Sequence, residues 1–213
     1  MASTTSRKLL LQLALPLVRT HGFTREALSR SVLSLPQPHA APLNETAVSA
    51  LFGNGDDARR SLIGAWLEEG RAEMRNAPST SVKDILSHRL RYNEPVLSLL
   101  PEAFATLATP TGIHLLDPNP AFKHAATIAD DACVISQDTS IGPSWYARRA
   151  SLAAIYTAAE LHQIASPETA YDFLSDLLEG SSRIKGAVDN VGQFASYVGK
   201  SWIGIIKSRG ILL

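Results

Sequence analysis

The sequence of 213 residues predicts an all-α protein of about ten helices that ends in a C-terminal amphipathic helix. Two observations lead to this fold class. No segment shows the sustained apolar–polar alternation, or the run of β-branched residues, that is typical of a strand. Apolar residues instead recur three and four positions apart along most of the chain, which is the spacing of one face of an α-helix.

Side-chain caps and prolines set the predicted helix boundaries, because Ser, Thr, Asn and Asp accept bonds from the first backbone N–H groups and Pro interrupts helices. The first helix is expected to begin at Ser6, and Thr24, Asn44 and Ser81 are expected to cap later ones. Gly142-Pro143-Ser144 introduces the most strongly patterned helix, with Ser144 in a capping role. The expected helices after the first are 24–35, 44–52, 56–76, 81–90, 121–134, 145–164 and 167–178, with an interrupted run from 95 to 107.

Composition disfavours several functions. The formal net charge is zero, so no overall field attracts nucleic acid. The single Cys133 excludes a disulfide framework, and none of the six histidines forms the His-x-x-His or Glu-x-x-His pair of helical metal sites. No Walker lysine and no Gly-x-Ser-x-Gly motif is present. We therefore expect a protein that is not an enzyme and that uses neither a metal nor a cofactor.

The last thirty residues predict a helix that lies on a membrane surface. An apolar stripe at alternating spacings of four and three is joined by basic residues, and Gly180-Ser181-Ser182 is expected to separate the tail from the preceding chain. Each interior glycine costs roughly 1 kcal/mol of helix propensity, so the helix should form only against a partner surface. That surface is a bilayer, another protein or the rest of this chain, and we favour the first two. The predicted membrane contacts are Ile184, Val188, Val191, Val198, Lys200, Trp202, Ile205 and Lys207.

The start of the 145–164 helix carries adjacent aromatic residues beside two arginines. Trp145 and Arg149 are four positions apart, so the indole ring can stack on the guanidinium group. Neighbouring positions point in different directions around a helix, so at least one of Trp145 and Tyr146 should be exposed. Exposed aromatics beside arginine are typical interface anchors. A buried helix whose aromatics fill the core is the alternative.

The run from Trp145 to Tyr156, followed by Glu160-Leu161, closely resembles the signature of the mitochondrial coenzyme Q biosynthesis lipid-binding proteins. Ser144 stands where that family usually has Asp or Asn. His21-Gly22-Phe23-Thr24 resembles the family's His-Gly-Trp-Thr, and Leu51-Phe52-Gly53 resembles its Met-Phe-Gly. The resemblance covers about residues 9 to 178 and is loose in the tail.

The resemblance implies a TetR-regulator-like helical bundle that forms a homodimer and holds an isoprenoid lipid or quinone in an apolar pocket. It also implies a non-catalytic role: presenting ubiquinone intermediates to the membrane-associated di-iron hydroxylase of demethoxyubiquinone. The expected location is the matrix side of the mitochondrial inner membrane, as a peripheral protein. The predicted lipid contacts are Trp145, Leu152, Ile155 and Tyr156, and the predicted partner contacts are Trp145, Tyr146, Arg148 and Arg149.

Three regions are expected on this basis: N-terminal helices in helix-turn-helix-like order (1–76), a lipid-binding and dimerisation region (77–180) and the membrane-associating helix (181–213). The order of the first helices leaves a TetR-type DNA-binding regulator as an alternative. The third helix, 45–52, contains no Lys or Arg, however, and the 36–43 connection is longer than a helix-turn-helix turn. An enzyme acting on a lipid would need a nucleophile–base pair that the sequence does not offer.

Overall fold

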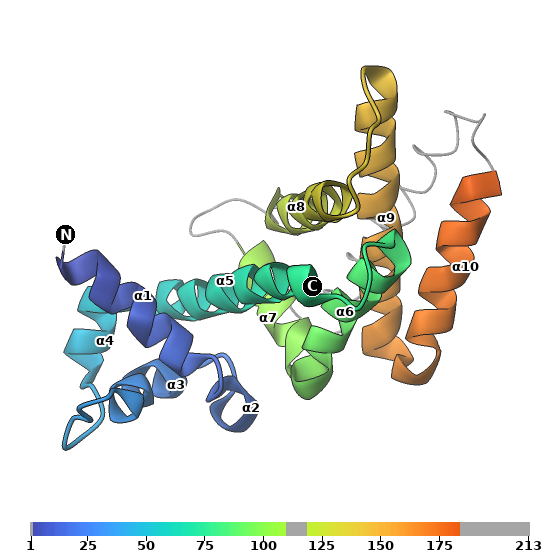
Figure 1. The fold of residues 1–213 in the computed structure, drawn as a ribbon. Coiled ribbons are helices and arrows are strands. Elements are labelled where there is room, and N and C mark those ends of the chain that lie inside the picture. Colours follow the sequence, from blue (N-terminus) through green and yellow to red (C-terminus); the bar gives the residue numbers. More distant parts are fainter. Residues whose placement is uncertain (1, 110–118, 184–213) are drawn as a thin grey trace. The chain divides into compact units, whose positions relative to one another are not determined.

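A computed structural model describes residues 2–109 and 119–183, and this part of the chain is helical and contains no strand (Figure 1). The predicted all-α class is therefore confirmed. The α-helices are α1 (Ala2–Ala14), α2 (Val18–His21), α3 (Arg25–Arg30), α4 (Glu45–Phe52), α5 (Asp56–Glu73), α6 (Val82–Asn93), α7 (Leu100–Ala108), α8 (Asn119–Ile135), α9 (Pro143–Ala165) and α10 (Ala170–Arg183). Short 3₁₀ helices are η1 (Ser31–Ser34), η2 (Met74–Asn76), η3 (Glu94–Leu99) and η4 (Pro167–Thr169).

Side-chain caps begin several of these helices as predicted. Thr24, Asn44 and Ser81 accept hydrogen bonds from the backbone N–H groups three residues later, at 3.3, 2.8 and 3.1 Å. Two other predicted starts are wrong. Helix α1 begins at Ala2 rather than Ser6. Ser144 lies inside α9, because Pro143, with its fixed φ, already occupies the first turn and Gly142 takes the cap position at φ 61°.

The described residues divide into two compact units, of which unit 1 comprises Met1–Glu69 and Glu102–Leu107. In unit 1, α1 packs against α3 and η1, and α3 packs against α4. Phe23 and Trp66 meet edge to face in its core, with ring centroids 5.9 Å apart. Helix α4 ends at Gly53, whose φ of 109° favours glycine and where a Cβ atom would lie 2.7 Å from the Cβ of Asp57.

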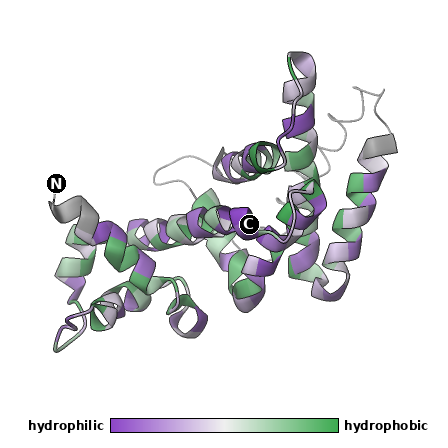
Figure 2. Ribbon diagram, viewed as in Figure 1, coloured by the Kyte–Doolittle hydropathy of each residue, from purple (hydrophilic) through white to green (hydrophobic). Residues whose placement is uncertain are grey.

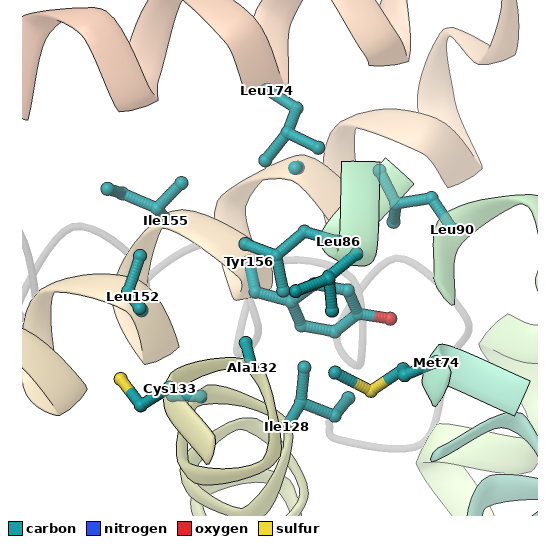
Figure 3. Close-up of a cluster of buried hydrophobic side chains, with 13 residues drawn as sticks. Met74, Leu86, Leu90, Ile128, Ala132, Cys133, Leu152, Ile155, Tyr156 and Leu174 are labelled. Atoms are coloured by element: carbon teal, nitrogen blue, oxygen red, sulfur yellow. The ribbon is translucent and has the colours of Figure 1, made fainter. Parts of the chain in front are cut away.

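Unit 2 comprises Gly70–Pro101 and the described residues from Ala108 onward. Helix α8 packs against α9, and α10 packs on α9 and α6 (Figure 1). Apolar and hydrophilic residues alternate in short stretches along these helices (Figure 2). The apolar stretches meet in a core cluster that joins η2, α6, α8, α9 and α10 (Figure 3). Its members are Met74, Ile85, Leu86, Leu90, Ile128, Ala129, Ala132, Cys133, Leu152, Ile155, Tyr156, Ala159 and Leu174.

The chain break predicted at Gly180-Ser181-Ser182 is wrong, because α10 continues through these residues to Arg183. Leu174, Leu177 and Leu178 pack on the core cluster. Burying such side chains contributes more than the roughly 1 kcal/mol that a glycine costs a helix. The membrane contacts predicted from Ile184 onward lie outside the described residues and stay a prediction. The functional assignment of the regions 1–76, 77–180 and 181–213 also stays a prediction. No helix in the described part of the chain has the length and apolarity needed to cross a bilayer.

Candidate functional site

Two adjacent aromatic side chains are exposed at the start of α9. Trp145 is 38% exposed and Tyr146 is 70% exposed. Their ring centroids lie 4.7 Å apart at an interplanar angle of 76°, an edge-to-face arrangement that aromatic pairs prefer. The expectation that at least one of the two rings is exposed is confirmed, and both in fact are.

Arg149 holds Trp145 in place, and the predicted stacking of these two side chains is confirmed. The guanidinium carbon of Arg149 lies 3.8 Å from the centroid of the Trp145 ring. Arg149 Nε donates to Asp130 Oδ1 at 2.6 Å, and Nη1 lies 3.7 Å from Asp138 Oδ2. A hydrogen bond from Ser140 lowers the pKa of Asp138, so this carboxylate is charged at neutral pH. Arg149 is thus anchored to α8 and to the α8–α9 loop.

Further apolar side chains are exposed at the same end of the α8–α9 pair. Val134, in the last turn of α8, is 65% exposed, and Ile141, two residues before α9, is 82% exposed. We call Val134, Ile141, Trp145 and Tyr146 the aromatic patch. Only Leu9 and Phe122 are other large apolar residues exposed in the described part of the chain. Four of the six large apolar residues exposed in the described part of the chain thus lie between residues 134 and 146, and such a concentration is typical of an interaction surface.

The predicted lipid contacts fall into two places. Leu152, Ile155 and Tyr156 lie in the core cluster of unit 2, where their side chains face those of α6 and α8 (Figure 3). Trp145 does not belong to this cluster and lies in the aromatic patch. Leu152 lies seven positions after Trp145, which corresponds to about 10 Å along the helix axis. The structure therefore brings three of the four residues together and leaves the fourth at the surface.

A buried polar cluster, which the sequence analysis missed, adjoins this apolar core. Arg89 and Asn93 of α6, His124 of α8, and Tyr156 and Glu160 of α9 are all buried. Glu160 Oε1 accepts hydrogen bonds from Tyr156 Oη at 2.7 Å and from Asn93 Nδ2 at 2.9 Å. Glu160 Oε2 lies 3.2 Å from His124 Nε2. An ionised carboxylate only accepts, so the proton of that contact belongs to the imidazole.

The electrostatics of this cluster keep Glu160 ionised. Burial alone raises the pKa of a carboxyl group, but the charge and hydrogen bond of His124, together with Arg89 and Tyr156, outweigh burial and lower the pKa of Glu160 to about 2. Burial raises the pKa of Tyr156 well above its usual value, so its hydroxyl stays protonated and donates. The sequence does contain a signal of this cluster, because Arg89 and Glu160 each interrupt a helix face that is otherwise apolar.

The helix-turn-helix-like region of unit 1 uses its arginines internally. Arg25 donates to Glu45 at 2.8 Å and to Ser49 Oγ at 2.7 Å, which ties α3 to α4. Arg59 and Arg60 donate to the backbone carbonyls of Phe23 and Thr106 at 3.0 and 3.2 Å. Side chains engaged in this way are poorly placed to contact DNA phosphates, which require accessible basic groups.

The fold and the aromatic patch together define the class of protein: an all-α protein that exposes aromatic side chains. The described ranges contain no group of residues that could hold a metal ion. Residues 119–185, which include α8, α9 and α10, match the COQ9 family model. The chain is similar to "Ubiquinone biosynthesis protein coq9, mitochondrial" of Schizosaccharomyces pombe, with 25% identity over 96% of this chain and 81% of the relative. It is 29% identical to the Bos taurus COQ9 protein and 28% identical to the Homo sapiens one.

These mammalian matches cover 89% of this chain and 59% of each relative, so the chain spans about six tenths of their length. The matches confirm the resemblance to the COQ9 family that the sequence shows. The segment that matches the family model is also the segment that carries the aromatic patch and a large part of the core cluster.

Proposed function

We propose that this protein is a non-catalytic lipid-binding protein of mitochondrial ubiquinone biosynthesis. It binds isoprenoid quinone intermediates and presents them to the membrane-associated di-iron hydroxylase of demethoxyubiquinone. The role in ubiquinone biosynthesis rests on the COQ9 relatives, which carry that role in their names. The observation that carries the finer proposal is the aromatic patch, which lies at one end of the helices whose other side chains build the core cluster.

The core cluster of unit 2 supports lipid binding. Leu152 and Ile155 lie there among apolar side chains from three other helices and η2. An isoprenoid chain consists of hydrocarbon and gains free energy when such surroundings replace water, at about 25 cal/mol per Å² of apolar surface. The bound lipid is the only small molecule that the proposed function requires.

The aromatic patch supports contact with the hydroxylase. Tyr146 and Trp145 present large rings, and rigid aromatic side chains provide much of the binding energy in protein interfaces. Arg149 fixes the orientation of Trp145, so little rotamer freedom remains to be lost when a partner binds. Arg148, the neighbouring half-buried basic residue, belongs to the same proposed surface.

The proposed location is the matrix side of the mitochondrial inner membrane. The relatives are named as mitochondrial proteins. Membrane association is assigned to the basic amphipathic stripe after residue 183, which would hold the protein as a peripheral homodimer near membrane-bound substrate.

The deciding experiment is native mass spectrometry of the purified protein with identification of the bound lipid. We expect one isoprenoid quinone or quinone precursor per chain. A preparation that carries no lipid after addition of such compounds would contradict lipid presentation. Tight, strongly salt-dependent binding of duplex DNA at low salt would instead support the regulator that the N-terminal helix order left open.

A further inference from the structure

Arg89 is a charged side chain in the interior of unit 2. Its exposed fraction is 0%, and it lies on α6 between Leu86 and Leu90, which belong to the core cluster. A guanidinium group stays protonated in proteins. A buried charge is unfavourable unless hydrogen bonds and an opposite charge compensate it. The hydrogen-bond acceptors around Arg89 therefore decide whether its charge is compensated.

The described residues provide an acceptor for only one part of the guanidinium group. Nη1 donates to Asn93 Oδ1 at 2.7 Å. Nε and Nη2 are buried and have no hydrogen-bond acceptor in the described part of the chain. These two nitrogens lie on the same edge of the planar group, and their N–H bonds point in parallel. That edge is the one that binds two oxygens of a carboxylate or a phosphate at once.

The rest of the polar cluster leaves this edge unused. Glu160, the carboxylate of the cluster, accepts from Asn93, Tyr156 and His124, and no ion pair within 4.0 Å joins it to Arg89. The guanidinium group is also closely packed. A Cβ atom at position 70 would lie 2.9 Å from its central carbon, and the Tyr92 ring centroid is 5.8 Å away. Nε and Nη2 are thus the donors of Arg89 that the described residues leave without an acceptor.

We propose that the Nε–Nη2 edge of Arg89 binds the oxyanion headgroup of a lipid, a carboxylate or a phosphate, held in unit 2. This inference rests on the proposed lipid-binding function and adds the headgroup chemistry to it. Tyr156 belongs both to the core cluster and to the polar cluster. A hydrocarbon tail beside Leu152 and Ile155 would therefore bring its head to the polar cluster, one turn further along α9.

Compounds with one tail and different heads test this assignment. Farnesoic acid, farnesyl phosphate and farnesol share a chain but carry a carboxylate, a phosphate and a neutral hydroxyl group. Hydrogen bonds to charged groups contribute enough to predict that the carboxylate or the phosphate compound binds about tenfold or more tighter than farnesol. The stronger of the two identifies the headgroup. Inorganic phosphate alone is expected not to bind, and binding of it that depends on Arg89 would overturn the assignment to a lipid.

Substitutions of Arg89 connect the preference to this side chain. Arg89→Met keeps the approximate volume and removes the donors, so the preference for the charged compound should fall to about one. Arg89→Lys keeps the charge without the paired donors, and it should lower the preference while serving as a second variant should Arg89→Met fail to fold. The matched control is Arg91→Met, an exposed arginine two positions further along α6, which should retain the wild-type preference.

The outcomes separate this inference from the proposed function. If farnesol binds as tightly as the charged compounds, or if the preference survives in both Arg89 variants, the oxyanion site is refuted and lipid binding stands. If none of the three farnesyl compounds binds the wild-type protein, both the headgroup assignment and lipid binding fail together.

Discussion

Replacing the two exposed rings of α9 by alanine should separate partner binding from folding. Tyr146→Ala removes a ring that is 70% exposed and contacts Trp145 through one edge. Trp145→Ala removes a ring that is 38% exposed and stacks on Arg149. We expect both variants to fold and to lose capture of the demethoxyubiquinone hydroxylase, with Tyr146 as the cleaner test because it has fewer contacts within the chain.

The magnitudes follow from these contacts. For Tyr146→Ala the loss is at most one edge-to-face contact, about 1 kcal/mol of unfolding free energy. Trp145→Ala also loses the contact with Arg149, which gives about 1–2 kcal/mol in total. At about 2–4 °C per kcal/mol for a chain of this size, melting temperatures should fall by about 8 °C or less. An aromatic residue at the centre of an interface contributes about 2 kcal/mol or more, so binding should weaken about thirtyfold.

The assay measures thermal melting and the dissociation constant for the hydroxylase on the same preparations. Phe122→Ala provides a matched control, because Phe122 is 55% exposed on α8. It lies at the opposite end of the α8–α9 pair: His124 contacts Glu160 there, whereas Asp130 contacts Arg149 near the patch. The control should leave binding unchanged.

Two results would refute this reasoning. Melting temperatures that fall by the equivalent of 3–5 kcal/mol in both variants would show that the rings are core residues. Unchanged hydroxylase binding in both variants would show that the aromatic patch is not the partner surface.

Three further predictions concern the tail, the polar cluster and the backbone. Removing residues 184–213 should leave a folded helical body that no longer floats with cardiolipin-containing liposomes. The reason is that each basic residue near an anionic surface contributes about 1 kcal/mol of membrane-binding free energy. Equal flotation of the truncated chain would show that the tail is not the anchor. The pKa of Glu160 is lowered from 4.5 to about 2 in the folded protein, so its contribution is present above pH 4.5 and is lost as the pH falls toward 2. In urea unfolding, the free energy of unfolding of the wild type should fall by about 3 kcal/mol more than that of Glu160→Gln as the pH is lowered from 4.5 toward 2. Gly53→Ala should destabilise the protein by about 1–3 kcal/mol in thermal melts, because φ is 109° and the new Cβ would meet Asp57. Gly180→Ala in α10 should stabilise it slightly, because a Cβ there meets nothing within 4 Å.

Features that depend on neighbours three or four residues away could be predicted from sequence. The caps at Thr24, Asn44 and Ser81 each join a side chain to a backbone group three positions on. The contact of Trp145 with Arg149 spans four positions of one helix. Such contacts follow from helix geometry alone, so no knowledge of the surrounding fold was needed.

Local patterns failed where packing outweighed propensity. Gly180 and the two serines after it predict the end of a helix, but α10 continues because its leucines pack on the core cluster. The sequence predicts Trp145 as a lipid contact together with Leu152, Ile155 and Tyr156. The core cluster includes the other three residues but not Trp145. Helical spacing tells which residues share a face, and the partner helix decides which end of that face is covered.

The sequence by itself determined the all-α class, the resemblance to the COQ9 family and the exposure of an aromatic residue at the start of α9. These rest on periodicity and on a contiguous motif, both of which are properties of the linear chain. Only the tertiary structure decided that Arg89, His124 and Glu160 meet in one buried cluster. It also decided that one edge of Arg89 has no acceptor among the described residues. Three helices far apart in the sequence bring these groups together, and hydrogen bonding between them depends on distances that no local pattern encodes.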